Sequence, residues 1–427
     1  MPDRDYDVVV IGAGPAGLAA ACRAAECGRR VALLDDNPHP GGQIWRNLSG
    51  KPPKQAARWL AAAERHAVEL IPGARVFDVP EPGRIAVEMF DAECRLGYRC
   101  LILATGARER FLPFPGWTLP NVVGAGGLQA LAKSGLPVAG KRVVIAGSGP
   151  LLLAVARYLR THGADVRLVA EQAPPSALLR FGLQLALRPA KLLQALALFG
   201  TRYLTSCWPV SAQGNERLES VTLRRAAHTW TEPCDYLACG FGLIPNLELA
   251  ELLGCRTGEG GVHVDDYQMT SVESVYCAGE ATGIGGLEPS IVEGEIAGYA
   301  AAGNLRRAQL RFPARQPHRR FAAALDTAFA LRDELRRLPR PGTLVCRCED
   351  VTIERVRACA TWREARLHTR CGMGPCQGRV CGGAVEFLLG WQTESVRPPV
   401  FPARIGSIAP APGPAGHVSD RKRPVSR

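Results

Sequence analysis

The chain has 427 residues, with 52 Lys and Arg against 40 Asp and Glu, for a formal net charge of +12. This length suits two or three domains, and 47% apolar with 22% charged residues is ordinary for a globular protein. The basic excess is mostly arginine spread along the chain, without the aromatic interleaving of a nucleic-acid surface. No export signal is visible. The apolar segment 181–199 carries Arg188, Pro189 and Lys191, which favours a buried or amphipathic helix over a membrane span.

The first 36 residues carry the clearest motif. The apolar run 8–11 predicts a buried parallel strand, followed by a glycine-rich turn, an Ala-rich helix and a second strand at 31–34. Glycines in such a turn allow its tight bend, the approach of a pyrophosphate and close helix–strand packing, and the acid after the second strand can accept from ribose hydroxyls. The predicted dinucleotide contacts are Gly12, Gly14, Pro15, Ala16, Gly17 and Asp35.

Three later segments are predicted to lie beside the same cofactor. A glycine pair with a polar residue follows at 41–43, and a strand ending at Leu103 leads into a small-residue turn. The strand 275–277 ends in glycine and a carboxylate that can accept from ribityl hydroxyls, ahead of a helix whose N-terminus can support the pyrimidine end of a flavin. The contacts predicted here are Gly42, Gln43, Ala104, Thr105, Gly106, Gly279 and Glu280.

A second copy of the opening motif begins 135 residues later, with a strand at 143–146 and a turn at 147–150. Leu152 replaces the third glycine, and Ala170 replaces the acid at the end of the second strand. Glu171 stands one residue later and is a candidate substitute. We therefore predict a degenerate NAD(P)-type domain that is structural or binds a different nucleotide, while NAD(P)H binding is disfavoured.

Fifteen cysteines without an export signal indicate a reducing, cytoplasmic environment. No pair suited to dithiol exchange occurs before residue 340, so disulfide reduction is not expected. Six cysteines fall between 346 and 381, in loops that begin with a tight Cys-x-Cys pair and are rich in glycine. That spacing favours an iron–sulfur cluster over zinc. Five candidates compete for four ligand positions: Cys346, Cys348, Cys371, Cys376 and Cys381.

Several motifs together resemble one family. They are Gly-Gly-Gln-Ile-Trp-Arg at 41–46, Ala-Thr-Gly-Ala-Arg-Glu-Arg at 104–110, Cys-Ala-Gly-Glu at 277–280, Cys-Arg-Cys-Glu at 346–349 and Gly-Met-Gly-Pro-Cys-Gln-Gly-Arg at 372–379. The chain resembles the FAD-dependent α-type subunits of bacterial heteromeric amine and amino-acid dehydrogenases. This family includes the A subunits of octopine and nopaline oxidases, the α subunit of D-hydroxyproline dehydrogenase and the B subunit of hydrogen cyanide synthase. The C-terminal segment resembles bacterioferritin-associated ferredoxin.

The resemblance implies a two-dinucleotide-binding α/β flavoprotein fold with FAD and a small helical [2Fe-2S] module. It implies Cys346, Cys348, Cys376 and Cys381 as iron ligands, with Cys371 as a neighbour and alternative. Electrons would come from an opine, a D-hydroxyproline or proline type substrate, or glycine, oxidised with a flavin-containing β subunit. A small ferredoxin-like subunit, and peripheral association with a respiratory acceptor at the membrane, stay open. The rival interpretations are an NAD(P)H-dependent reductase and a non-catalytic scaffold.

The expected domain boundaries follow from these motifs. They are an FAD-binding domain at 1–115 and 235–303, a degenerate NAD(P)-type domain at 116–234, a helical linker at 304–340, a [2Fe-2S] domain at 341–392 and a disordered tail at 393–427.

Overall fold

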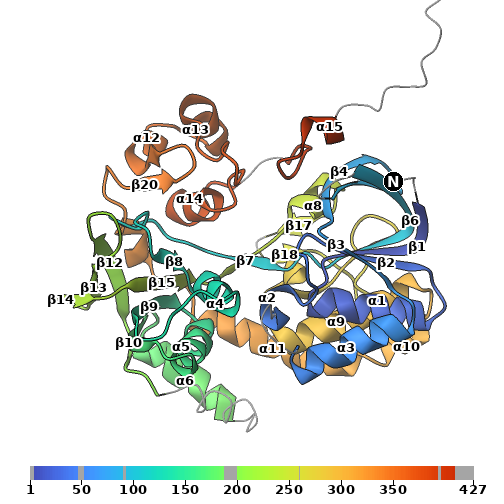
Figure 1. Cartoon of the computed structure of the whole chain (residues 1–427), viewed down its shortest axis with the longest axis horizontal. Helices are drawn as coiled ribbons and strands as arrows, with labels where there is room; N and C mark the ends of the chain where they lie inside the picture. Colours follow the sequence, from blue (N-terminus) through green and yellow to red (C-terminus); the bar gives the residue numbers. More distant parts are fainter. Residues whose placement is uncertain are drawn as a thin grey trace, which may run out of the picture.

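The computed structural model describes residues 4–46, 52–89, 93–186, 200–258, 260–392 and 396–408. Two α/β domains, each built on its own sheet, stand side by side, and a smaller helical module lies above the second one (Figure 1). The two-dinucleotide-binding fold predicted from the sequence is confirmed.

The first domain is built on a seven-stranded sheet with the order β3-β2-β1-β6-β5-β4, in which β19 pairs with β6. Its strands are β1 (Arg4–Ile11), β2 (Val31–Asp35), β3 (Glu69–Pro72), β4 (Arg75–Glu81), β5 (Arg84–Glu88), β6 (Glu93–Leu103) and β19 (Val275–Cys277). The strands β3, β2, β1, β6 and β19 are parallel, and β4 and β5 are antiparallel. Because β1 is covered on both faces, its side chains are buried on alternate sides, with Val8 and Val10 in one core and Val9 and Ile11 in another.

Helices α1 (Pro15–Glu26), α3 (Lys54–Arg65) and α9 (Leu287–Ala301) cover one face of this sheet (Figure 1). Two glycines bring α9 against α1: a Cβ at Gly294 would lie 2.1 Å from the carbonyl oxygen of Ala16, and one at Gly298 would lie 2.2 Å from that of Ala20. The short helices α2 (Gly42–Trp45), α8 (Glu248–Leu252) and η1 (Gly279–Thr282) and the strands β17 (Thr257–Gly258) and β18 (Gly261–Val262) complete the domain.

Gly298→Ala is expected to destabilise the first domain. The added methyl group would meet the backbone of Ala20, and overpacking of this kind costs about 1–3 kcal/mol, more than the helix-propensity gain of about 1 kcal/mol. Gly182→Ala is the matched control, because this glycine is also helical and a Cβ there would meet nothing within 4 Å. Chemical denaturation should show a loss for the first variant and a slight gain for the control; equal stabilities would contradict the close α1–α9 contact.

The connection between the domains is a pair of antiparallel strands, β7 (Ala107–Glu109) and β16 (Leu243–Pro245). The second domain has a five-stranded parallel sheet with the order β11-β10-β9-β15-β8. The strands are β8 (Val122–Gly124), β9 (Arg142–Ser148), β10 (Asp165–Glu171), β11 (Tyr203–Leu204) and β15 (Tyr236–Phe241). The domain also has a separate meander of β12 (Cys207–Gln213), β13 (Ser220–Arg225) and β14 (His228–Pro233). Its helices are α4 (Ala125–Lys133), α5 (Leu151–Thr161) and α6 (Pro175–Ala186).

The expected boundary at residue 235 is wrong. β15 pairs with β9 and β8, so it is the fourth strand of the second sheet and does not belong to the first domain. The other boundary shifts as well, because Leu112 and Phe114 are fully buried in the core of the second domain. The crossing points are therefore β7 and β16, each three residues long.

The segment after the first domain is helical, with α10 (Leu305–Gln309), α11 (Phe312–Ala328) and η2 (Asp333–Arg337). α11 runs from the first domain to the second, where Phe321 and Phe329 both contact Phe181 of α6. Among the described residues, no helix is long and apolar enough to cross a membrane. Of the segment 181–199, residues 187–199 lie outside the described ranges.

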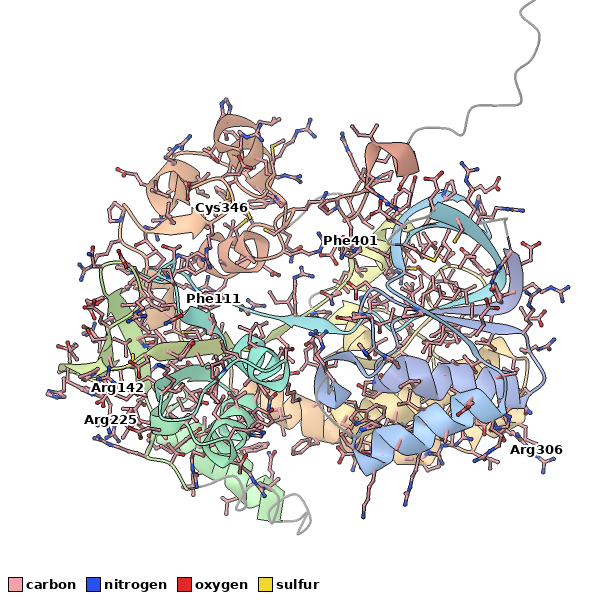
Figure 2. The ribbon with its side chains drawn as sticks, viewed as in Figure 1. Phe111, Arg142, Arg225, Arg306, Cys346 and Phe401 are labelled. Atoms are coloured by element: carbon pink, nitrogen blue, oxygen red, sulfur yellow. The ribbon has the colours of Figure 1, made fainter. Side chains whose placement is uncertain are left out.

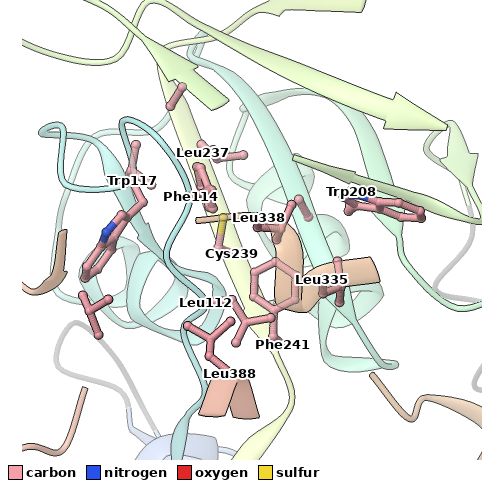
Figure 3. Close-up of a cluster of buried hydrophobic side chains, with 14 of the residues drawn as sticks. Leu112, Phe114, Trp117, Trp208, Leu237, Cys239, Phe241, Leu335, Leu338 and Leu388 are labelled. Atoms are coloured by element: carbon pink, nitrogen blue, oxygen red, sulfur yellow. The ribbon is translucent and has the colours of Figure 1, made fainter. Parts of the chain in front are cut away.

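The C-terminal module contains β20 (Leu344–Cys346), β21 (Val351–Thr352), α12 (Ile353–Arg357), α13 (Trp362–Thr369) and α14 (Cys381–Leu389). It shares one hydrophobic core with the second domain, and Figure 3 shows Leu388 of α14 beside Leu112 in this core. The indole of Trp117 also donates a hydrogen bond to the carbonyl oxygen of Leu344, at 2.6 Å. The module therefore packs on the second domain, although the two are separate segments of the chain.

Part of the expected disordered tail is ordered. Residues 396–408, which include α15 (Ile405–Ile408), lie on the first domain. Val400 is buried and its N–H donates to the carbonyl oxygen of Phe77 at 2.9 Å, and the guanidinium of Arg404 pairs with Glu88 at 2.9 Å. Residues 393–395 and 409–427 lie outside the described ranges.

Candidate functional site

The turn between β1 and α1 leaves room for a ligand on one side only. At Gly12 (φ +103°) a Cβ would lie 2.2 Å from the carbonyl oxygen of Ala104, and at Gly17 it would lie 1.7 Å from that of Gly12. At Gly14 a Cβ would meet only the Cα of Gly42, at 3.9 Å. Gly14 is also the N-cap of α1 and provides no side-chain cap, so N–H groups of the first turn are free for a phosphate.

Asp35 lies where the motif predicts, at the carboxyl end of β2. Its side chain is 6% exposed, and Oδ2 accepts from the N–H of Ala13 at 2.7 Å. Oδ1 accepts from the backbone N–H and the side-chain amide of Asn37, both at 2.8 Å. The carboxylate is thus fixed beside the glycine turn, as a ribose acceptor would be.

Two further predicted segments meet at the same turn. The N–H of Gly41 donates to the carbonyl oxygen of Ala13 at 2.8 Å, which holds Gly42 against Gly14 and leaves Gln43 exposed on α2. On the other side of the turn, the backbone of Ala104 lies against Gly12, and Thr105 and Gly106 follow Ala104 in the chain.

Asn246 holds this second segment and was not predicted as a site residue. Its side-chain amide donates to the carbonyl oxygen of Thr105 at 2.9 Å, its own carbonyl oxygen accepts from the Thr105 hydroxyl at 2.9 Å, and its N–H donates to Gly106. A lone asparagine after a proline gives no local signal of this role, because its partners lie far back in the sequence.

Glu280 lies on η1, at the end of β19, and its carboxyl group has no hydrogen-bond partner among the described residues. Burial raises the pKa of this carboxyl group. Gly279 (φ +78°) packs against Ala16 of α1, where a Cβ would approach the Ala16 methyl to 2.7 Å. A half-buried carboxyl group to which the described residues donate no hydrogen bond, beside the α1 turn, fits an acceptor for ligand hydroxyls.

Glu293 positions this segment and was also missed. Its Oε2 accepts from the N–H of Gly279 and from the Thr282 hydroxyl, both at 3.0 Å. Burial is the main cause that raises the pKa of Glu293. Glu293 lies on a helix of mostly apolar residues, where its spacing gives no signal of this role. Only its burial, which the structure shows, identifies it.

A cleft of about 1040 Å³ opens between the first domain, α11 and the C-terminal module. Thr282 and Glu293 line it on one side, and Met373 and Gly378 of the cysteine loop line it on the other. Arg110 also faces it; burial lowers the pKa of this guanidinium, and Glu386 acts against that effect. The first domain and the cysteine loop therefore border one cleft, although the predicted FAD contacts themselves are not among its lining residues.

The C-terminal cysteines come together as two contacting groups. The sulfur atoms of Cys346, Cys371 and Cys381 lie within 4.8 Å of one another and are buried. The thiol of Cys381 lies beside those of Cys346 and Cys371, and the thiol of Cys348 lies beside that of Cys376. Figure 2 marks Cys346 inside the module. Thiol donors of this number and closeness fit a metal centre that binds thiolates.

Cys371 belongs to the same group of buried thiols as Cys346 and Cys381. It is fully buried and contacts the thiol of Cys381. The glycines around it allow the turns of the loop, with φ of +77° at Gly372 and +83° at Gly378, and the ring of Trp362 packs on both. The structure thus brings all five candidate thiols together and leaves the choice of four ligands open.

The cysteine loop is tied to the first domain through Arg379. Its guanidinium stacks on Phe401 at 4.1 Å and lies 3.7 Å from Glu248 Oε1. Its carbonyl oxygen accepts from the guanidinium of Arg108 at 3.2 Å. These contacts join the cysteine loop to the first domain and to Phe401, which Figure 2 labels beside that domain.

In the second motif, Leu152 is fully buried in the core beneath α5, and Ala170 pairs with Ala146 inside the sheet. Glu171 takes the position of the missing acid: its Oε2 accepts from the N–H of Gly149 at 2.8 Å, as Asp35 accepts from Ala13. Burial raises the pKa of Glu171 to about 7.

Comparisons with known proteins agree with this arrangement. The family described as pyridine nucleotide-disulphide oxidoreductase matches residues 6–304. The chain is 32% identical to the A subunit of opine oxidase from Rhizobium meliloti (strain 1021), over 95% of this chain and 98% of the relative. It is also 32% identical to the HcnB subunit of hydrogen cyanide synthase from Pseudomonas aeruginosa, over 88% of this chain and 90% of that protein.

Two solved structures share the fold. L-proline dehydrogenase from P. horikoshii has a TM-score of 0.69 at 18% identity, over 96% of this chain and 81% of that chain. Thioredoxin reductase from T. acidophilum has a TM-score of 0.55 at 21% identity, over 70% of this chain and 99% of that chain. The chain is an oxidoreductase that belongs to the pyridine nucleotide-disulphide oxidoreductase family and, within it, to the group of opine oxidase A subunits and HcnB.

Proposed function

We propose that this chain is the FAD- and [2Fe-2S]-containing redox subunit of a heteromeric dehydrogenase that oxidises the C–N bond of a secondary amine or amino acid. The observation that carries the proposal is the shared cleft, which the dinucleotide-binding domain borders on one side and the cysteine loop on the other. The relatives named above are subunits of an opine oxidase and a hydrogen cyanide synthase, which supports a heteromeric enzyme.

The α1 turn fits FAD because the only open side of the turn is at Gly14, beside uncapped N–H groups. Asp35 would hold the ribose, and Glu280 would accept from the ribityl hydroxyls. Thr105, Gly106 and Gln43 would lie along the ring. Bound FAD would supply acceptance of two electrons from a C–N bond, and a bound [2Fe-2S] cluster would supply single-electron transfer.

The contacts among the thiols suggest how the chain would hold the cluster. Cys346, Cys348, Cys376 and Cys381 would hold the cluster, since Cys346 lies beside Cys381 and Cys348 lies beside Cys376. Cys371 would remain beside Cys381. Each ligand must lose its thiol proton on binding metal, so cluster assembly should release protons.

The names of the relatives support a proposal for the substrate class and the partners. We infer a flavin-containing β subunit as partner and an opine, a proline type substrate or glycine as substrate, with an acceptor other than NAD. We assign no catalytic base among the side chains that line the described cleft. Measurements on the assembled complex decide whether this subunit's flavin or the partner's flavin oxidises the substrate.

The test is purification of this chain together with its untagged partner subunits, followed by a screen of secondary amines and amino acids with a dye acceptor. We expect substrate-dependent dye reduction by the complex and none by the chain alone with NADH. Rapid bleaching of the flavin by NADH, with no amine active, would instead favour an NADH-dependent reductase. A flavin that no candidate amine reduces in the complex would favour a scaffold.

A further inference from the structure

The segment 329–332, between α11 and η2, lies on the second dinucleotide-binding motif; we call it the tether. The carbonyl oxygen of Phe329 accepts from the hydroxyl of Ser148 at 2.8 Å. The side-chain amide of Gln172 donates to the carbonyl oxygen of Ala330 at 3.1 Å and accepts from the N–H of Arg332 at 3.1 Å. Ser148 belongs to the glycine turn, and Gln172 directly follows Glu171.

Both ends of the tether are anchored by side chains of the same domain. The ring of Phe329 packs edge-on against Phe181, with 5.6 Å between centroids. The guanidinium of Arg332 lies 5.1 Å from the ring centre of Trp208 and donates to the hydroxyl of Ser206 at 3.3 Å. The tether is therefore held by backbone hydrogen bonds in its middle and by ring contacts at its ends.

The position of the tether matters because a dinucleotide lies across the turn after the first strand and the end of the second strand. Here the tether lies between Ser148 and Gln172, at the ribose end of that path. The carboxyl group of Glu171 is fully buried and accepts from the N–H groups of Gly149 and Ala173, both at 2.8 Å. A Cβ at Gly149 would meet nothing within 4 Å, so the site is closed at its ribose end and not at its phosphate end.

We propose that the tether occupies the second dinucleotide-binding site of its own chain, and that this contact holds the C-terminal module on the second domain. The chain continues from the tether into η2, where Leu335 and Leu338 enter the core that the module shares with this domain. A segment tethered in this way competes at an effective concentration in the millimolar range or above, so a free nucleotide is at a disadvantage.

Hydrogen–deuterium exchange of the purified full chain tests the proposal. In the double variant Ser148→Ala, Gln172→Ala, the tether loses three side-chain hydrogen bonds that hold its middle, so amides of 329–338 should exchange at least roughly tenfold faster. The matched control is Ser220→Ala, Gln213→Ala, a serine–glutamine pair bonded within the β12–β13 meander. Exchange of 329–338 equal in the two double variants would overturn the proposal.

A variant on the tether itself guards against misfolding of the double variant. Arg332→Ala removes the contacts with Trp208 and Ser206 and leaves the buried Ser148 and Gln172 in place. Exchange of 329–338 should again rise, and an unchanged rate would contradict the anchoring.

The occupant is tested with NADH and ADP on the wild-type chain. Neither should change the exchange of 329–338, and neither should bind below about 1 mM, because the tether already fills the ribose end. Low-micromolar binding, or faster exchange of the tether with nucleotide, would show a displaceable lid and overturn the proposal. These measurements need no substrate, partner or cluster, so their failure is distinct from failure of the proposed function.

Discussion

Gly14→Val is expected to yield a folded chain without FAD. A Cβ at this position would meet only the Cα of Gly42, at 3.9 Å, so the protein itself has room for the side chain. The branched side chain would fill the space that the pyrophosphate needs, and overpacking of about 3 kcal/mol corresponds to a loss of roughly 100-fold in affinity. The flavin absorbance per protein measures the result.

Controls separate loss of FAD from loss of folding. Gly342→Val is the matched substitution, because this exposed glycine lies in the loop before β20 and a Cβ there would meet nothing within 4 Å. Gly12→Val would be a poor choice, because its Cβ would lie 2.2 Å from the carbonyl oxygen of Ala104 and its φ is +103°. A folded Gly14→Val chain with full FAD would refute this turn as the cofactor site.

The second large effect concerns the cysteines. Cys346→Ser, Cys348→Ser, Cys376→Ser and Cys381→Ser should each lose the visible [2Fe-2S] spectrum, because each would remove one of the four predicted sulfur ligands and open a position on iron. Cys371→Ser should keep the spectrum with a shifted potential, because its sulfur would be a neighbour of the cluster. Visible absorption of anaerobically purified protein measures all five.

Cys371→Ser is also the built-in control, since its thiol is as buried as those of Cys346 and Cys381. If it loses the cluster while Cys381→Ser keeps it, Cys371 takes the place of Cys381 as a ligand beside Cys376. The flavin spectrum should survive in every variant. The cores of the first domain are separate from the core that the module shares with the second domain, so damage to the module should not reach Gly14.

The features that the sequence predicted are those with local signals. The turn from Gly12 to Gly17 and the acid at Asp35 are fixed by neighbouring residues, and the structure places them together. The clustering of Cys346 and Cys348 with the later cysteines is equally visible as spacing. Resemblance to a family extended this to cofactors and partners.

What escaped prediction depends on contacts between distant segments. β15 has the composition of any buried strand, so its pairing with β9 rather than β6 could not be inferred. Asn246 and Glu293 act through backbone groups far from them in sequence. Val400 lies in a Pro-rich stretch that has no core of its own and is buried only because the first domain offers one.

The central claim is that one chain carries a flavin in its first domain and an iron–sulfur cluster in its C-terminal module. The most direct test is the cofactor content of the chain purified without air, by flavin, iron, sulfide and zinc analysis. We predict FAD together with iron and acid-labile sulfide in equal amounts, as the composition of a [2Fe-2S] cluster requires. A colourless protein with stoichiometric zinc at the cysteines would contradict it.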